Sequence, residues 1–369
     1  MHPAIPRKLP RSGLAWESLI PQIGAANRAL AHYDGVLRAV PNPGILLSPL
    51  TTQEAVLSSR IEGTRATLGE VLKFEAGEEV PEEQKRLDIQ EIVNYRRALR
   101  AAEEALQRRP FSLNLLRELH GILLDSVRGR NKGRGRFRTV QNFIAPLGAG
   151  IEEALFIPPE PGRVMEYMDN WEKYYHAEEP DALVQLAIVH AQFEVIHPFV
   201  DGNGRLGRML VPLFLFEHRI LSRPMFYLSS YLEAHRDEYY GLLRGLDGPG
   251  SWNRWVTFFL GALVEQAKAN TDIARGILAL YERLKRQTLS LTHSQYAIPL
   301  LDHLFRQPIF APSNLFDLDD MPSKPMVMQL IRKLRDAGIL AVLREAKGRR
   351  GQILALSELV NLSEGRRVA

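Results

Sequence analysis

The chain has 369 residues and a mass of 41.8 kDa, which is enough for about two or three domains with substantial cores. Apolar residues make up 45% of the chain and charged residues 24%, so wholesale disorder is excluded. The absence of cysteine excludes a disulfide scaffold, a thiolate zinc site, an iron–sulfur cluster and a cysteine nucleophile. No stretch approaches the ~20 apolar residues that cross a bilayer. These features predict a soluble, cytoplasmic protein without membrane contact.

The net charge of +4 is unevenly distributed along the chain. Ten Lys and Arg residues against four acids follow residue 322, and the preceding part is close to neutral. The ten are Lys324, Arg332, Lys333, Arg335, Arg344, Lys347, Arg349, Arg350, Arg366 and Arg367. A basic terminal region favours contact with a polyanion, and a solvated charged surface explains the same pattern equally well.

Helical patterning dominates the first 285 residues. Apolar residues recur at three- and four-residue steps, which predicts helices over 53–74, 87–107, 113–127, 181–195, 204–216, 231–243 and 252–285. The segment 181–195 is apolar on nearly all sides, as expected of a helix buried in a bundle. The long helical patterning ends near residues 287–292, so we predict a helical region over 1–110, a helical core over 111–285 and a separate module over 286–369.

Signals for strands are sparse. Residues 139–145 and 154–158 have the character of a hairpin around the Gly-rich 147–150. Residues 339–343 and 352–356 predict a second hairpin around the basic turn 347–351. The expected fold class is mainly α, with one small β-hairpin in the body and a small α+β module at the end.

One segment, residues 197–208, carries most of the chemistry and reads His-Pro-Phe-Val-Asp-Gly-Asn-Gly-Arg-Leu-Gly-Arg. Its proline disfavours helical backbone at His197, so the buried helix is expected to end there. Residues 202–204 permit positive φ and form an anion nest that leads into a helix N-terminus, where phosphate is favoured. Arg205 and Arg208, three residues apart on one helix face, can bind phosphate oxygens.

Two further side chains of this segment suit phosphoryl or nucleotidyl transfer. Asp201 offers a carboxylate to Mg²⁺, which binds through one or two carboxylates and substrate phosphates. His197 can accept a proton near neutral pH. Taken singly, each feature has an ordinary structural explanation, and their combination within twelve residues favours function. A zinc pair of His190 and His197 would need a third ligand that the sequence does not supply.

The segment resembles the signature of the Fic family, His-Pro-Phe-x-Asp/Glu-Gly-Asn-Gly-Arg-x-x-Arg, and meets every fixed position. The resemblance implies an all-α core that transfers AMP from ATP, with Mg²⁺, to a Ser, Thr or Tyr hydroxyl of a protein. It implies that His197 is the general base, that Asp201 binds Mg²⁺ and that Arg208 binds the γ-phosphate. The nucleotide-binding residues it implies are Gly202, Asn203, Gly204, Arg205, Leu206, Gly207, Arg208, Tyr240 and Leu243, the last two against adenine.

Two stretches outside the signature extend the resemblance. Residues 137–144 with 156–159 are similar to the family's β-hairpin flap, so a target protein is expected to bind along 139–158 by strand addition. Residues 58–63, Ser-Ser-Arg-Ile-Glu-Gly, are similar to the Ser/Thr-x-x-x-Glu-Gly/Asn pattern of the family's autoinhibitory helix, here within 53–74. This similarity implies that Ser58, Glu62 and Gly63 act in inhibition.

Two basic regions remain. The run 128–138 has six positive residues and no acid, and we expect a loop near the phosphates with at least one structural arginine, rather than a nucleic-acid stripe. The region after residue 286 resembles a winged-helix module, with 323–336 as recognition helix between Ser323 as N-cap and Gly338. A hairpin with Lys347, Arg349 and Arg350 forms the wing. Such a module binds DNA or packs against protein, and the sequence leaves both open.

Two classes of function compete. The first is a protein adenylyltransferase that also modifies itself and is inhibited by Glu62. The second is a DNA-binding regulator whose Fic core senses nucleotide; the intact His197 favours the enzyme, because a sensor needs no base. Within the enzyme class, removal of AMP and transfer of a different nucleotide or phosphate group stay open, as does the homodimer that is common among such proteins.

Overall fold

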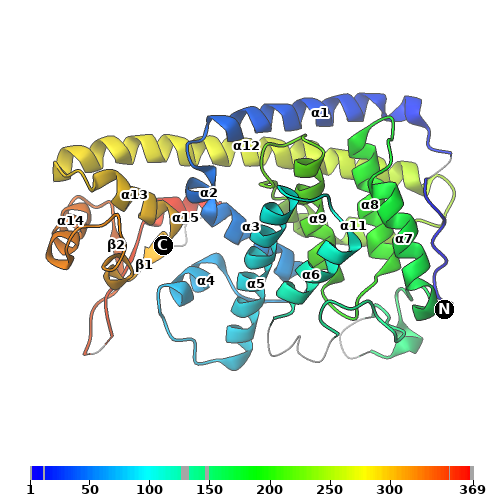
Figure 1. Cartoon of the computed structure of the whole chain (residues 1–369), viewed down its shortest axis with the longest axis horizontal. Coiled ribbons are helices and arrows are strands. Elements are labelled where there is room, and N and C mark those ends of the chain that lie inside the picture. The colour runs from blue at the N-terminus through cyan, green and yellow to red at the C-terminus, as the bar shows by residue number, and fades with distance from the viewer. Residues whose placement is uncertain (1, 11–12, 126–132, 146–148, 349, 366–369) are drawn as a thin grey trace. The chain divides into compact units, whose positions relative to one another are not determined.

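The computed structural model describes residues 2–10, 13–125, 133–145, 149–348 and 350–365, and its described part is mainly helical (Figure 1). The α-helices are α1 (Trp16–Ala39), α2 (Pro43–Leu46), α3 (Ser48–Ile61), α4 (Leu68–Glu75), α5 (Glu83–Leu106), α6 (Leu113–Leu123), α7 (Val164–Tyr175), α8 (Ala182–Ile196), α9 (Asn203–Glu217), α10 (Ser229–Ala234), α11 (Arg236–Arg244), α12 (Ser251–Thr292), α13 (Ala297–Arg306), α14 (Lys324–Asp336) and α15 (Ser357–Glu364). The strands are β1 (Ile309–Phe310), β2 (Ala341–Arg344) and β3 (Ile353–Ala355), and short 3₁₀ turns cover Ile151–Glu153, Pro161–Arg163 and Pro312–Leu315. The expected fold class is confirmed.

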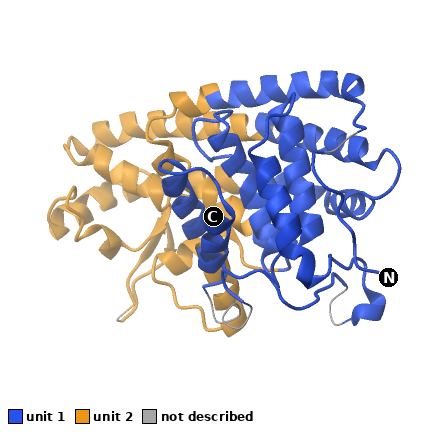
Figure 2. Cartoon of the chain, turned by 45° about the vertical axis from the view of Figure 1, so that its right-hand side comes forward, with its two compact units in different colours: residues 1–34, 57–63, 94–268 blue, residues 35–56, 64–93, 269–369 orange. Residues whose placement is uncertain are grey.

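The chain divides into two compact units, coloured separately in Figure 2. Unit 1 comprises residues 1–34, 57–63 and 94–268, and unit 2 comprises residues 35–56, 64–93 and 269–369. Unit 1 contains both the signature segment and residues 58–63. Unit 2 contains the C-terminal region together with two earlier stretches of the chain. The division at residues 110 and 285 that the sequence suggests stays a prediction.

Helix α8 forms the centre of unit 1. Every residue from Leu183 to Phe193 is buried, as the uniformly apolar sequence predicts, and α8 packs against α7 and α9. The Asp181 side chain caps the helix by accepting hydrogen bonds from the backbone N–H groups of Leu183 and Val184, at 2.9 and 3.0 Å. The helix ends at Ile196, so a rigid, buried element delivers His197 to the site.

The single helix expected over 53–74 is wrong, because the chain leaves helical geometry after Ile61. Gly63 adopts φ +98°, a left-handed conformation that ends α3. A new helix starts after Thr67, whose hydroxyl accepts from the Glu70 N–H while the Glu70 carboxylate accepts from the Thr67 N–H. Glu62 therefore lies just beyond a helix C-terminus instead of within a long helix.

Other boundaries also differ from expectation. The helix expected over 231–243 is two helices, α10 and α11, which meet at His235. Helix α6 ends at Leu123 instead of 127, a position outside the described residues, and α12 continues to Thr292 instead of ending at 285. The Lys333 ammonium donates to the carbonyls of Leu291 and Thr292 and so caps the end of α12.

The hairpin expected over 139–145 and 154–158 is reduced to one antiparallel bridge within the described residues, between Ile144 and Phe156. The Gln141 side chain donates to the Pro158 carbonyl at 2.9 Å, where a strand would place a backbone N–H. Because Pro158 and Pro159 have no N–H, the ladder cannot extend in this direction. Residues 146–148 of the expected turn lie outside the described part of the chain.

Unit 2 contains an antiparallel sheet in the order β1-β3-β2. Strands β2 and β3 form the expected C-terminal hairpin, and the sheet packs against α4 in a small core. Its buried residues are Leu68, Leu72, Ala76, Ile309, Ile353, Ala355 and Val360. Gly338, at φ +73°, follows the end of α14 as expected, but the Ser323 side chain makes no capping hydrogen bond.

No helix of the described residues is long and apolar enough to cross a membrane.

Candidate active site

His197 lies at the junction between α8 and the signature loop. Its backbone is left-handed, at φ +50°, and its N–H donates to the Phe193 carbonyl at 2.9 Å. The imidazole Nδ1 lies 3.3 Å from the Glu194 carbonyl, and the Arg138 Nε donates to the His197 carbonyl at 2.9 Å. These contacts hold both the backbone and the imidazole ring of His197 in place.

The imidazole of His197 is uncharged at neutral pH. Burial lowers its pKa to about 4, while the carbonyl of Glu194 and the charge of Glu62 act in the opposite direction. A neutral imidazole can accept a proton, so the predicted base is in the required protonation state.

The signature loop is pinned by Asn203. Its Oδ1 accepts from the Phe199 N–H at 2.9 Å, and its Nδ2 donates to the Phe199 carbonyl at 2.8 Å. Phe199 is buried and stacks on His120, with ring centroids 3.8 Å apart. The Asn203 side chain thus holds the loop in shape. The backbone N–H of Asn203 is left to contact an anion.

The N-terminus of α9 supplies the anion nest. Gly202 precedes the helix at φ +81°, and the first-turn N–H groups that follow have no intrahelical acceptor. The Asp201 carboxylate accepts from the Gly202 N–H at 2.6 Å and from the Arg205 guanidinium at 3.2 Å. The Asp201 side chain is 33% exposed, so it borders the nest and stays accessible.

Arg208 contacts the predicted inhibitory segment. Its side chain is only 1% exposed; Nε donates to Ser58 Oγ at 2.9 Å, and Nη2 donates to the Ser58 carbonyl at 2.8 Å and to Glu62 Oε1 at 2.6 Å. Partial burial alone would raise the pKa of Glu62, but the charge and hydrogen bond of Arg208 outweigh it and hold this pKa below its usual value. Glu62 Oε1 lies 2.2 Å from where a Cβ on Gly204 would be, directly over the first turn of α9.

Family models match both halves of this arrangement. The Fic/DOC family N-terminal model matches residues 20–104, and the Fic/DOC family model matches residues 110–215, which include the complete signature. The chain belongs to the Fic/DOC family.

Curated relatives of this Fic protein are partial matches. A probable protein adenylyltransferase of Aquifex aeolicus is 36% identical over 85 residues, which are 23% of this chain and 27% of the relative. A protein adenylyltransferase Fic of Drosophila grimshawi is 27% identical over 159 residues, 42% of this chain and 29% of the relative. The chain thus spans less than a third of the length of either relative.

A solved structure shares the fold over nearly the whole chain. The crystal structure of a Fic family protein from Desulfovibrio desulfuricans has a TM-score of 0.60 and 19% identity, and the match covers 95% of this chain and 98% of that one. At this identity the likeness supports the fold alone.

The other residues of the Fic protein that are predicted to contact the nucleotide lie in differing surroundings. Leu206 is buried in the core, and the Gly207 carbonyl accepts from His190 Nδ1 at 2.9 Å. His190 Nε2 bonds to the Tyr239 hydroxyl, so both ring nitrogens are engaged and a zinc pair with His197 has no support. Burial raises the pKa of Tyr240 to about 12, and the charges of Glu62 and Arg208 act on it, so Tyr240 lies close to the site.

Leu243, the other predicted adenine contact, is buried and lines a small pocket with Phe156 and Val195. Phe156 belongs to the predicted flap, and Val195 lies two residues before His197 on α8. The role of Leu243 beside the nucleotide base therefore stays a prediction.

Three side chains around the candidate site were not identified from the sequence. Arg138, 3% exposed, is the structural arginine of the basic run and donates to the carbonyls of Pro159, Ile196 and His197; residues 126–132 of that region lie outside the described part. His120 accepts from the Gly135 N–H and its Nε2 bonds to the Asp201 carbonyl, which fastens the loop. Glu194 lies one helical turn before His197. The sequence gives this position but not the surroundings of the carboxyl group.

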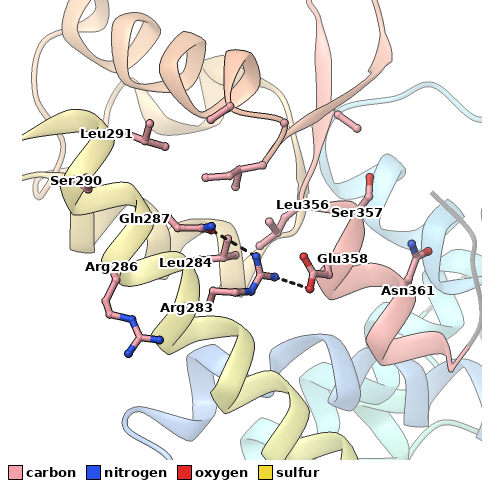
Figure 3. A pocket seen from close by; sticks show the side chains of 14 residues that line it. Arg283, Leu284, Arg286, Gln287, Ser290, Leu291, Leu356, Ser357, Glu358 and Asn361 are labelled. Atoms are coloured by element: carbon pink, nitrogen blue, oxygen red, sulfur yellow. Dashed lines mark hydrogen bonds and ion pairs between the residues drawn. The ribbon is translucent and has the colours of Figure 1, made fainter.

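Unit 2 contains a pocket of about 760 Å³, shown in Figure 3. Side chains from α12, from the turn after α14 and from the start of α15 line it. Arg283 of α12 pairs with Glu358 of α15, and it also donates to Gln287, one turn further along α12.

Proposed function

We propose that this Fic protein transfers AMP from ATP to a hydroxyl side chain of a target protein and of itself. The observation that carries the proposal is a neutral His197 beside an anion nest within a complete Fic signature. His197 takes the proton of the hydroxyl, the oxygen forms a bond to the α-phosphorus, and the bond to pyrophosphate breaks. The nest and Arg205 would hold the α- and β-phosphates, and Arg208 the γ-phosphate.

A labelled nucleotide tests this function. Incubation of the full-length protein with α-labelled ATP should label the protein, whereas γ-labelled ATP should not, because pyrophosphate leaves. Parallel reactions with α-labelled UTP, CTP and GTP identify the transferred group. Labelling from the γ-position would overturn adenylyl transfer in favour of phosphate transfer, and release of AMP from labelled protein would reveal the reverse reaction.

Asp201 fits a magnesium ion that is shared with the substrate. Its accessible carboxylate borders the nest, and Mg²⁺ binds through few protein carboxylates together with phosphate oxygens and water. When bound, Mg²⁺ would neutralise charge on the phosphates and on the leaving pyrophosphate. Asp201 would hold the ion, and the same carboxylate orients Arg205.

We expect Asp201→Asn to raise the Mg²⁺ concentration needed for half-maximal transfer by about tenfold or more, since one charged ligand is lost. The measurement is a Mg²⁺ titration of initial rates for wild type and variant. As a control, Asp181→Asn alters the cap of α8 and should leave the titration unchanged. An unshifted Asp201→Asn titration would place the ion on other residues.

The target segment is proposed to bind along residues 139–158. Asn142 is fastened to the signature loop, because its Nδ2 donates to the Phe199 carbonyl at 2.9 Å. Five large apolar side chains of this region are exposed, namely Val140 (57%), Phe143 (39%), Ile144 (37%), Ile151 (43%) and Leu155 (44%). A target segment that adds backbone hydrogen bonds and covers these side chains with apolar residues fits this surface best.

Autoinhibition is proposed from the contact of Glu62 with Arg208. The carboxylate bonds to Nη2, one of the groups that a γ-phosphate would need, and it covers Gly204 at the mouth of the nest. Because Glu62 is 34% exposed while Arg208 is 1% exposed, the acid is the partner that can leave.

A DNA-binding role for unit 2 is supported by the exposed face of α14. Gln329, Arg332 and Arg335 are exposed there, opposite a buried face of Val327, Leu330, Ile331 and Leu334, and the hairpin turn exposes Lys347 and Arg350. Exposed guanidinium groups on one helix, together with a basic turn in the same unit, suit a nucleic-acid backbone.

We expect Arg332→Ala/Arg335→Ala to weaken binding of duplex DNA about tenfold at low salt, since two phosphate contacts are removed. Retardation of a labelled duplex by the full-length protein measures this. The matched control Arg28→Ala/Arg108→Ala removes two exposed arginines from unit 1. Equal losses in both variants, or no retardation by the wild type, would contradict a DNA interface on α14.

A further inference from the structure

Two carboxyl groups lie against the first turns of α9. Glu62 Oε1 occupies the space beside Gly204, and Glu194 Oε1 lies 2.0 Å from where a Cβ on Gly207 would be. Gly204 and Gly207 are three residues apart and share one helix face, next to Arg208. The absence of side chains at both glycines is what admits the two acids.

The two acids have different partners. Glu62 bonds to Arg208, whereas Glu194 Oε1 is buried and has no hydrogen-bond partner among the described residues. Burial raises the pKa of Glu194 to about 8; Arg208 opposes this shift, and the charge of Glu62 adds to it. Glu194 therefore retains its proton at neutral pH while Glu62 is docked.

We propose that Glu194 is a second brake on the terminal-phosphate subsite: when Glu62 leaves Arg208, Glu194 releases its proton and pairs with Arg208 in its place. The ligand affected is a nucleoside triphosphate, whose third phosphate reaches Arg208. A nucleoside monophosphate does not extend that far and is unaffected. The inference rests on the proposed function only for the place of the terminal phosphate.

Electrostatics gives the direction of this exchange. Departure of Glu62 removes a like charge and leaves Arg208 without its carboxylate, and both changes lower the pKa of Glu194. An ionised Glu194 competes with phosphate for Arg208, whereas a protonated one is neutral and can donate to a phosphate oxygen. Binding of ATP to the opened site therefore takes up a proton, and its affinity falls as pH rises.

The other titratable groups facing Glu194 do not titrate in the same range. Arg208 stays charged, and burial raises the pKa values of Tyr239 and Tyr240 on α11, that of Tyr240 to about 12. On α8, burial lowers the pKa of His190 to about 3 and that of His197 to about 4. A pH dependence near neutrality that disappears with Glu194 is therefore assigned to this carboxyl.

The test is equilibrium binding of ATP and of AMP to the full-length protein in a Glu62→Gly/His197→Ala background, which prevents turnover. With Glu194 present, the Kd for ATP should rise at least about fivefold from about pH 6 to about pH 9, and less than about twofold with Glu194→Gln. The Kd for AMP should follow the same course with and without Glu194. Because ionisation of ATP itself is common to both variants, it cancels in the comparison.

Two further variants control the experiment. Glu103→Gln removes another unit 1 carboxyl whose pKa is raised by burial, and it should leave the pH dependence intact. Glu194→Asp keeps an ionisable group on a shorter side chain, so the Kd for ATP should depend on pH less than it does with Glu194. This variant tests the proposal even if Glu194→Gln fails to fold. The same pH dependence with and without Glu194, or an equal effect on AMP, would overturn the proposal. Adenylyl transfer is assayed separately in Glu62→Gly, so absence of transfer beside a Glu194-dependent Kd would reject only the proposed function.

Discussion

Glu62→Gly is expected to raise the rate of adenylyl transfer, self-modification included, by about tenfold or more, equivalent to about 1.4 kcal/mol. Glu62 occupies Arg208 Nη2 and covers Gly204, and on the proposed autoinhibition ATP that enters the wild-type site would lie with its α-phosphorus misaligned for attack. In-line geometry supplies most of the catalysis of phosphate reactions, and small misplacements therefore cost orders of magnitude. Initial rates with α-labelled ATP measure the effect.

Two companion variants make this prediction decisive. Glu62→Gln keeps the size of the side chain but loses the charge, so its rate should lie between wild type and Glu62→Gly. Glu62→Gly/His197→Ala should be inactive. If wild type and Glu62→Gly had equal rates, Glu62 would be a helix-end residue worth only a few tenths of a kcal/mol to stability. Label in the double variant would come from other chemistry.

His197→Ala, tested in the Glu62→Gly background, should reduce transfer by about 10²- to 10⁴-fold, the range typical of general-base catalysis. The nest and Arg208 do not depend on the imidazole, so ATP binding should persist. Burial lowers the pKa of His197 to about 4, so at saturating ATP the wild-type rate should rise as pH increases through that value and be level above it. Glu62→Gly lacks the charge that raises this pKa, so its rise should lie at lower pH. The measurements are initial rates and ATP binding across pH.

A second histidine serves as a control for this substitution. His235 is exposed at the junction of α10 and α11, and His235→Ala should leave the rate unchanged. Undiminished transfer in His197→Ala would assign proton removal to another group. Loss of ATP binding in that variant would instead show that the imidazole holds the loop.

The sequence predicts best what depends on local pattern. Helix α8 follows from its uniformly apolar composition, and its end follows from the proline after His197. The break between α3 and α4 was also readable, because Gly63 and the capping box of Thr67 and Glu70 are explicit signals. The predicted strand pair of the flap is not formed, because the Gln141 side chain takes the place of a backbone N–H donor to the Pro158 carbonyl.

The long-range contacts of the site could not be predicted from local sequence pattern. Ser58 and Glu62 lie about 150 positions from Arg208 in sequence, so only the family resemblance could join them before the structure did. The unpartnered carboxyl of Glu194 depends on the space beside Gly207 on a different helix. No spacing within α8 or α9 encodes that contact.

The left-handed backbone of His197 bears on how this activity can be lost. A side chain at φ +50° costs about 1 kcal/mol, which glycine would not incur. A single substitution to glycine would thus remove the base, relieve strain and leave the loop, the nest and Arg208 in place. The strain relieved offsets part of the stability lost with the buried imidazole, so this change costs less here than at a residue with ordinary backbone. On the proposed function, a nucleotide-binding protein without transfer activity differs from this chain by one amino-acid substitution.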